Sequence, residues 1–187
     1  EAMRDGSLAP MGGAGGIVEA DETYFGSKDV VTKRTRRGKS THGNKRSVVA
    51  LVERGGAARS FHVERATKAA VTEIVEANVA KEAHLNTDES RLYNDARNHV
   101  ASHETVHHTS GEYVRGLVHT NSVEGYFSVF KRGMRGVYQW CAEKHLHRYL
   151  AEFDFRYSTC HISDSQRMRS LMTRTGGRRL TYKPLTS

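Results

Sequence analysis

The sequence has few cysteines, few prolines and no long apolar stretch. Its two cysteines, Cys141 and Cys160, are too few for a disulfide framework and belong to no paired-cysteine metal motif, which favours a reducing, cytoplasmic setting. With two prolines and 37% hydrophobic residues, the chain is not expected to be disordered or of low complexity. The longest apolar run, Val48 to Val52, is far shorter than the ~20 residues that a bilayer requires. The sequence therefore predicts no membrane-spanning helix and no secretory signal.

The length of 187 residues is that of one domain, long enough to bury a core without metal or disulfide cross-links. Residues 1–16 contain a glycine-rich run and are interpreted as a linker or the remnant of a missing N-terminal region. Residues 17–156 are expected to form the folded domain, and residues 157–187 a basic C-terminal tail.

Basic residues are concentrated in two segments. The chain carries a net charge of +8; residues 28–46 contribute +7 and residues 167–183 contribute +6, which leaves −5 for the remainder. Because each Lys or Arg that neutralises a phosphate releases a counterion, this segregation favours a polyanionic partner. A solvated basic loop and a basic tail would give the same charge pattern.

Hydrophobic periodicity divides the chain into strands and helices. Runs of β-branched and aromatic residues predict strands over residues 17–25, 47–53, 58–63, 83–87 and, more weakly, 104–109. Apolar residues at helical spacing predict helices over residues 66–79, 91–100 and 121–137. This order predicts an α/β domain with a mixed β-sheet flanked by helices, in which functional residues collect at strand ends.

The segment 121–137 has the most regular helical pattern. Its apolar residues form one core-facing stripe, made of Val123, Tyr126, Phe127, Phe130, Met134 and Val137. A polar stripe beside it carries Asn121, Glu124, Ser128, Lys131 and Arg135. Asn121 and Glu124 also have the spacing of a capping box, with Asn121 as N-cap and Glu124 reaching back. Gly133 and Gly136 can end the helix early.

Three acidic residues lie where a mixed sheet can bring them together. Asp21 is within the first predicted strand, Asp88 closes the fourth, and Glu124 lies on the helix. Hard cations such as Mg²⁺ take oxygen ligands, and two such ions can stabilise the attacking and leaving oxygens of a phosphoryl transfer. Lys131, seven residues after Glu124 on the same helix face, can meet a DNA phosphate.

Two of these acids also have structural alternatives. Asp21 stands beside Glu19 and Glu22, so any one of the three can be a surface acid. Asp88 can simply cap the helix that follows it. On local pattern alone, these alternatives remain open.

Four motifs follow one another along the chain: Val18 to Gly26 (VEADETYFG), Asn86 to Glu89 (NTDE), His119 to Ser128 (HTNSVEGYFS) with Lys131 to Gly133 (KRG), and Lys144 to Leu150 (KHLHRYL). Together they resemble the DDE-type transposases of bacterial insertion sequences, in particular the fifteen-ninety-five (ISXO-two-like) group. The resemblance covers about Gly16 to Arg156. Each motif alone is weak evidence, whereas four in the family's order are specific.

The resemblance implies an RNase-H-like catalytic domain over residues 17–156 that uses two Mg²⁺ or Mn²⁺ ions. It implies cleavage and joining of double-stranded DNA at transposon ends: a metal-activated water cuts the DNA, and the freed 3′-hydroxyl attacks the target. Asp21 matches the first catalytic aspartate of the family and Asp88 the second. The bacterial cytoplasm, in association with the nucleoid, and a homo-oligomer during synapsis are implied as well.

The third catalytic position has two candidates under this resemblance. The group often carries Asn there, which matches Asn121, whereas Glu124 keeps the usual spacing from Lys131. Because they lie one helical turn apart, both are expected to face the metals, as ligands with Asp21 and Asp88. Lys131 is expected to position DNA.

Basic residues near these motifs are expected to contact the DNA backbone. They are Lys33, Arg34, Arg36, Arg37, Lys39, Lys45, Arg46, Arg132 and Arg135. Two alternatives to an active transposase are a truncated, inactive remnant that still binds DNA, and a nuclease on the same fold that cuts branched DNA. The short segment before the first strand lacks the zinc-binding and helical region that family members commonly carry, so specific recognition of transposon ends is not expected from this chain alone.

Overall fold

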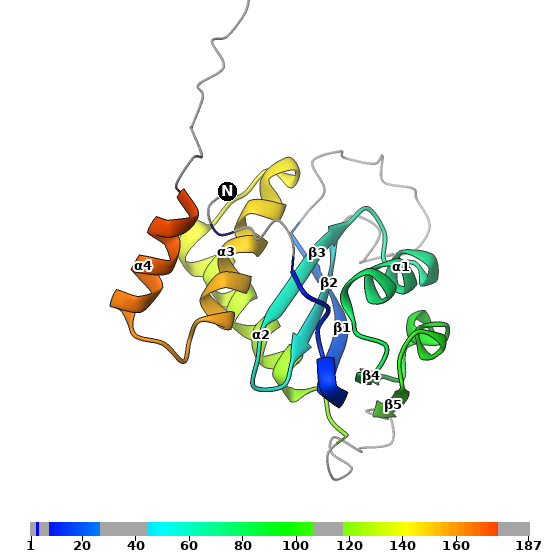
Figure 1. Cartoon of the computed structure of the whole chain (residues 1–187). Coiled ribbons are helices and arrows are strands. Elements are labelled where there is room, and N and C mark those ends of the chain that lie inside the picture. Colours follow the sequence, from blue (N-terminus) through cyan, green and yellow to red (C-terminus); the bar gives the residue numbers. More distant parts are fainter. Residues whose placement is uncertain (1–2, 4–7, 27–44, 107–117, 176–187) are drawn as a thin grey trace, which may run out of the picture.

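The computed structural model describes residue 3 and residues 8–26, 45–106 and 118–175. Its centre is a five-stranded sheet in the order β3-β2-β1-β4-β5 (Figure 1). The strands are β1 (Ile17–Phe25), β2 (Arg46–Glu53), β3 (Ala58–Val63), β4 (His84–Asp88) and β5 (Ser102–Val106). The α-helices are α1 (Lys68–Asn78), α2 (Asn121–Gly133), α3 (Leu146–Ser158) and α4 (Asp164–Thr175).

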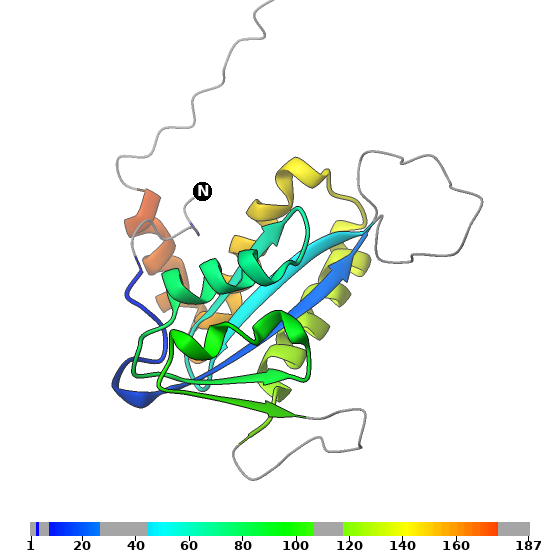
Figure 2. The same cartoon turned by 90° about the vertical axis from the view of Figure 1, so that its right-hand side faces the viewer.

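The sheet is mixed, as the sequence predicts. Strand β1 pairs antiparallel with β2 and parallel with β4, while β2 pairs antiparallel with β3 and β4 parallel with β5. The β2–β3 hairpin turns at Gly55, whose φ of 72° lies in the left-handed region that glycine tolerates best. Figure 2 shows β1 and β2 side by side along the middle of the sheet. The mixed sheet and its flanking helices confirm the α/β, RNase-H-like fold.

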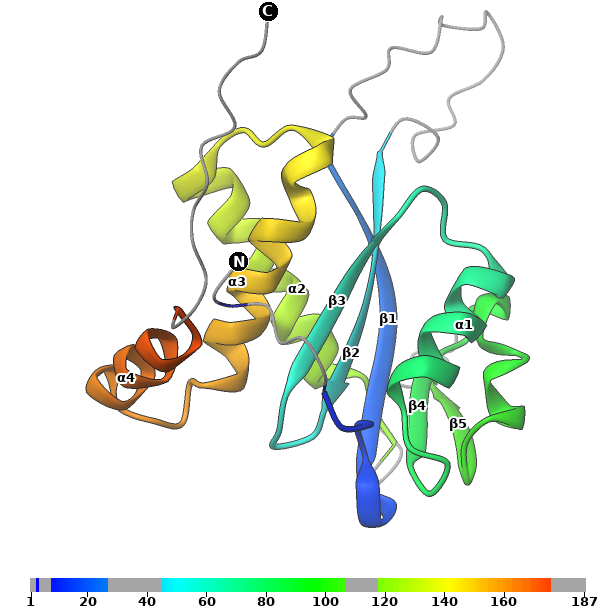
Figure 3. The same cartoon turned by 45° about the horizontal axis from the view of Figure 1, so that its top comes forward.

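Strand β2 is covered on both faces, because helices pack against each side of the sheet (Figure 3). Alternate residues of a strand point to opposite faces. Val48, Ala50 and Val52 join the core under α2 and α3, whereas Val49 and Leu51 join the core under α1. By the same alternation, the acidic residues at positions 19 and 21 of β1 face the side of α2.

The helix predicted over residues 91–100 is not continuous. Two short 3₁₀ turns, η2 (Arg91–Tyr93) and η3 (Ala96–Asn98), take its place. Asn94 and Asp95 separate the turns, and Asn and Asp side chains compete with the helical backbone for hydrogen bonds. Apolar periodicity alone therefore overestimated the helix.

Helix α2 buries the predicted stripe except for its last member. Five residues are at most 4% exposed, namely Val123, Tyr126, Phe127, Phe130 and Met134. Val137 is 75% exposed, because the chain continues after Gly133 as a π-helical segment, η5 (Met134–Tyr138), which changes the helical phase. A Cβ at Gly133 would lie 2.6 Å from the Phe153 ring, so glycine is what allows α2 and α3 to approach this closely.

The C-terminal segment that was predicted to be a basic tail includes helix α4. This helix carries no buried residue, and it lies at the periphery beyond α3 (Figure 3). Every helix among the described residues is too short or too polar to cross a bilayer.

Candidate metal centre

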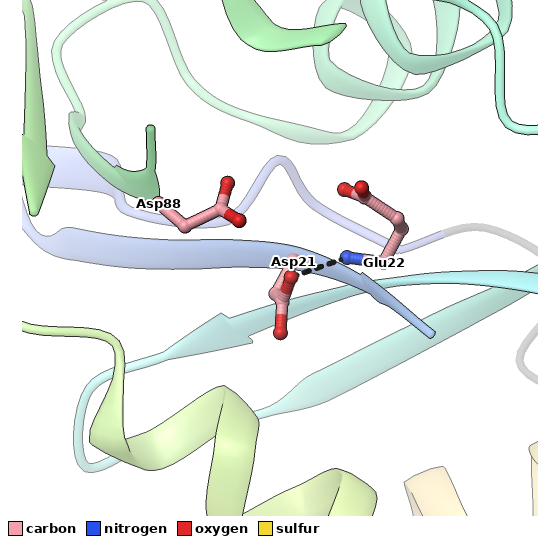
Figure 4. A group of neighbouring side chains, drawn as sticks. All are labelled: Asp21, Glu22 and Asp88. Atoms are coloured by element: carbon pink, nitrogen blue, oxygen red, sulfur yellow. Dashed lines mark hydrogen bonds between the residues drawn. The ribbon is translucent and has the colours of Figure 1, made fainter. Parts of the chain in front are cut away.

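Asp21 and Asp88 come together at the centre of the sheet. The parallel register pairs Ala20 with Thr87, so the next residues of β1 and β4 are these two aspartates. Their carboxylates and that of Glu22 each offer an oxygen, and the three oxygens lie within 4.8 Å of one another (Figure 4). Neighbouring residues of a strand normally face apart, and Figure 4 shows Asp21 and Glu22 pointing to opposite sides of β1, with the Asp88 carboxylate on the side of Glu22.

The charges of this acidic cluster (Asp21, Glu22 and Asp88) oppose one another. Burial raises the pKa of Asp21 to about 8, with further contributions from the charges of Asp88, Glu22 and Glu124. Burial and the charge of Asp88 also raise the pKa of Glu22. Carboxyl groups that are buried close together without a cation titrate upward in this way.

The acidic cluster fits a divalent cation. The Glu22 Oε2 atom is buried and forms no hydrogen bond with the described residues, although the Tyr93 hydroxyl lies near the Glu22 carboxyl group and partly offsets the rise in its pKa. A buried carboxylate oxygen without a donor is costly, and a cation would relieve that cost. Three carboxylates also form the hard, all-oxygen donor set that Mg²⁺ and Mn²⁺ prefer.

Asp88 is also bonded to the backbone that follows it. Its Oδ1 accepts a 3.0 Å hydrogen bond from the backbone N–H of Ser90, and the Ser90 hydroxyl in turn accepts from the N–H of Leu92 at the start of η2. The capping alternative for Asp88 is thus wrong: Ser90, and not Asp88, is the N-cap of η2, and Asp88 accepts the backbone N–H of that N-cap residue. This bond fixes the carboxylate at the end of β4.

Helix α2 brings two further charged groups toward Asp21. The Glu124 charge is among the causes of the raised pKa of Asp21. Burial lowers the pKa of Lys131, and the Asp21 charge opposes that effect. Asn121 is the exposed first residue of the helix, one turn before Glu124.

The capping box predicted for α2 is not formed. Thr120, not Asn121, is the N-cap residue, and the Glu124 carboxylate accepts a 2.9 Å hydrogen bond from the Thr120 hydroxyl. The side chain that caps the helix comes instead from strand β1. Glu19 Oε2 accepts from the backbone N–H groups of Ser122 and Val123, at 2.7 and 3.1 Å.

Glu19 and Glu22 are the residues whose roles sequence reasoning missed. Both were weighed only as surface acids beside Asp21, yet Glu19 is 0% exposed and Glu22 joins the acidic cluster. Strand alternation could have placed Glu19 on the same face as Asp21. The same alternation places Glu22 on the face opposite Asp21, so nothing in the sequence indicated that both residues would lie near Asp88.

The acidic cluster lies in a region that matches a known protein family. The family model described as the ISXO2-like transposase domain matches residues 13–158. The chain belongs to this transposase family. A search of curated proteins finds no match. The match spans every strand of the sheet together with α1, α2 and α3, and it includes the acidic cluster and α2.

Four of the nine residues predicted to contact DNA lie in the described part of the chain. The other five lie outside it: Lys33, Arg34, Arg36, Arg37 and Lys39. Lys45 and Arg135 lie close enough to Lys131 to lower the pKa of its ammonium group, and Arg132 is exposed on α2.

The structure corrects the assignment of Arg46. This residue begins β2, is 4% exposed, and its guanidinium Nη1 donates a 2.6 Å hydrogen bond to the carbonyl oxygen of Cys141. The arginine therefore ties β2 to the segment between α2 and α3 inside the transposase domain. We leave it out of the DNA-binding surface.

Proposed function

We propose that this transposase domain cuts and joins DNA by divalent-metal-dependent phosphoryl transfer, with Asp21 and Asp88 as the principal metal ligands. The observation that carries the proposal is the gathering of three carboxylates from two adjacent strands, with one buried oxygen that forms no hydrogen bond with the described residues. Arranged in this way, the carboxylates repel one another, and this arrangement is stable only with protons or a cation between them.

Mg²⁺ or Mn²⁺ would supply Lewis acidity at the phosphodiester and lower the pKa of an attacking water or hydroxyl group. The charges of Asp88 and Glu124 both raise the pKa of Asp21, so Asp21 would hold a cation together with either of these carboxylates. Asp88, held at the end of β4, would complete one ion's ligand set. Glu22 offers a further oxygen to the same set.

The third position of the site is proposed to be shared by Asn121 and Glu124. A neutral amide oxygen is a weaker ligand than a carboxylate, whereas Glu124 is close enough to Asp21 to affect its pKa. We therefore propose Glu124 as the stronger ligand of the third position and Asn121, one helical turn before it, as the weaker one. Lys131 would meet the DNA phosphate next to Asp21.

The proposed substrate is double-stranded DNA, at the transposon end and at the target. Lys45, Lys131 and Arg135 form a basic group beside the acidic cluster, with mutual repulsion that an anionic backbone would relieve. Two transposon ends would require two copies of the chain during synapsis.

A nicking assay tests this function. The substrate is DNA that contains the element's end, and the reaction is run with Mg²⁺, with Mn²⁺ and with a chelator. The wild-type chain is expected to cut only with metal, and Asp21→Ala and Asp88→Ala are each expected to lose at least about a thousandfold in rate, as is typical when a group central to catalysis is removed. DNA binding in chelator should persist in both variants.

Two results of this assay would contradict the proposal. If wild type and both variants bind DNA equally and none cuts it with either metal, the chain is a DNA-binding remnant. If wild type cuts branched DNA but does not cut linear DNA that contains the element's end, it is a structure-selective nuclease.

A further inference from the structure

The Glu19 carboxylate is buried between strand β1 and helix α2. It is 0% exposed, and both of its oxygens are bonded. Oε2 accepts the two backbone N–H groups of the first turn of α2. Oε1 accepts a 3.0 Å bond from the Ser122 hydroxyl and two bonds, of 2.7 and 3.1 Å, from the Arg54 guanidinium. The His119 Nδ1 atom also lies 3.2 Å from Oε1.

A buried carboxylate is costly unless its charge and its lone pairs are matched. Arg54 supplies the opposite charge, and the N-terminal end of α2 supplies free N–H groups and the positive end of the helix dipole. The local sequence provides no such cap, since Thr120 makes no side-chain capping bond to the helix backbone. The cap of α2 therefore depends on a residue about one hundred positions earlier in the chain.

The position of Glu19 links this cap to the metal centre. Glu19 lies two residues before Asp21 on the same face of β1. Ser122, its partner in α2, follows Asn121 and precedes Glu124 by two positions. One side chain thus joins the strand that carries the first acid to the helical turn that carries the third position.

We propose that Glu19 is a positioning residue: by capping α2 from β1, it fixes Asn121 and Glu124 relative to Asp21. Glu19 itself touches neither DNA nor metal in this assignment. Its effect on catalysis is exerted through the helix. The inference rests on the proposed function and extends it to a residue outside the acidic cluster.

The test compares wild type with Glu19→Gln and with the matched control Asp154→Asn. Asp154 is also a carboxylate that accepts a backbone N–H and two hydroxyl groups, from Ser60 and Tyr126, but it lies against the middle of α2. Two readouts are collected on each protein: amide hydrogen exchange along α2 by NMR, and kcat and KM for nicking of end-containing DNA with Mn²⁺.

In Glu19→Gln, the amide group turns a donor toward either the helix N–H groups or the guanidinium. We expect the Ser122 and Val123 amides to exchange at least about tenfold faster, as for loss of a helix cap. We expect kcat to fall about tenfold or more with KM for DNA within about twofold, because ground-state DNA binding is untouched. Asp154→Asn should change neither the exchange at the first turn nor kcat.

The inference is overturned if Glu19→Gln cuts as fast as wild type, or if Asp154→Asn lowers kcat as much as Glu19→Gln does. If wild type itself does not cut with Mn²⁺, the proposed function fails instead, which separates the two. Should Glu19→Gln not fold, Ser122→Ala removes only the hydroxyl bond to Glu19. It is then expected to lower kcat about threefold, in line with the loss of one hydrogen bond, and an unchanged kcat overturns the inference.

Discussion

Two acidic residues on the same face of strand β1, Glu19 and Asp21, have opposite surroundings. Glu19 is surrounded by donors: a guanidinium, a hydroxyl and two backbone N–H groups. Asp21 is surrounded by carboxylates, and its pKa is raised to about 8. Burial alone therefore does not distinguish a structural acid from a metal-binding one. The distinction lies in the direct partners. Glu19 is paired with a guanidinium and three further donors, whereas Asp21 accepts one backbone N–H and faces other carboxylates, with the Lys131 charge acting on it without a hydrogen bond among the described contacts.

The largest expected effect is on the stability of the metal-free protein, where the two positions should respond with opposite signs. Glu19→Ala should lower the free energy of unfolding by about 3 kcal/mol, because it leaves Arg54 and the α2 terminus without their acceptor. Asp21→Asn should raise it by about 1 kcal/mol, because it removes one of several opposing charges. Urea denaturation in chelator measures both changes. The comparison between the two positions is wrong if both variants shift stability in the same direction.

A third buried carboxylate, Asp154, sharpens the comparison because its direct donors are neutral. Burial raises its pKa to about 7, although its bonds to Tyr126 and Ser60 oppose the shift. Since the folded pKa lies above the unfolded value, the contribution of Asp154 to stability is present below about pH 4 and is lost as pH rises through about 7.

The slope of this loss cannot exceed about 1.4 kcal/mol per pH unit for one proton. Unfolding curves measured from pH 4 to 8 should show a shallower decline in Asp154→Asn than in wild type. Parallel profiles for the two proteins would show that Asp154 does not titrate in this range.

Glu124 is expected to contribute to catalysis, as Asp21 does, and not to the stability of the fold, as Glu19 does. Glu124→Gln should lower the nicking rate about a hundredfold, as when one group that stabilises developing charge is lost, with little change in stability. Ser128→Ala, on the same polar stripe one turn later, is the matched control and should cut at the wild-type rate. Equal rates for Glu124→Gln and wild type would move the third position to Asn121.

The smallest expected effect concerns DNA contact. Lys131→Ala should weaken DNA binding and lower the nicking rate by about tenfold, and it should reduce the slope of log K against log salt by about 1. Arg46→Ala should leave that slope unchanged, because its side chain is buried against Cys141. A salt slope that is the same in Lys131→Ala as in wild type would remove Lys131 from the DNA surface.

Much of the fold could be predicted because strands and helices leave local patterns. The bounds of β1 and β3 are as predicted, and α2 begins where its polar and apolar stripes begin. Asp21, Asp88 and Glu124 could be proposed from the ends and faces of these elements. The early end of α2 at Gly133 agrees with the glycines at this point of the sequence, but the π-helical turn that exposes Val137 could not be predicted, because nothing in the apolar period marks a change of helical phase.

The partners of the acids were beyond local reasoning. Glu19 caps a helix about one hundred residues away, and Glu22 meets Asp88 only through the pairing of β1 with β4. A basic residue in a charged segment can likewise be structural, as Arg46 is. In each case the sequence shows which residue is charged, but only the three-dimensional fold shows what that residue contacts.

The most direct test of the metal centre is a crystal of this chain soaked in Mn²⁺ and measured at a wavelength where manganese scatters anomalously. The account predicts an anomalous peak within coordination distance of both Asp21 and Asp88, absent from Asp21→Asn crystals treated in the same way. Peaks found only elsewhere, or none at a concentration of Mn²⁺ that supports nicking in solution, would contradict it.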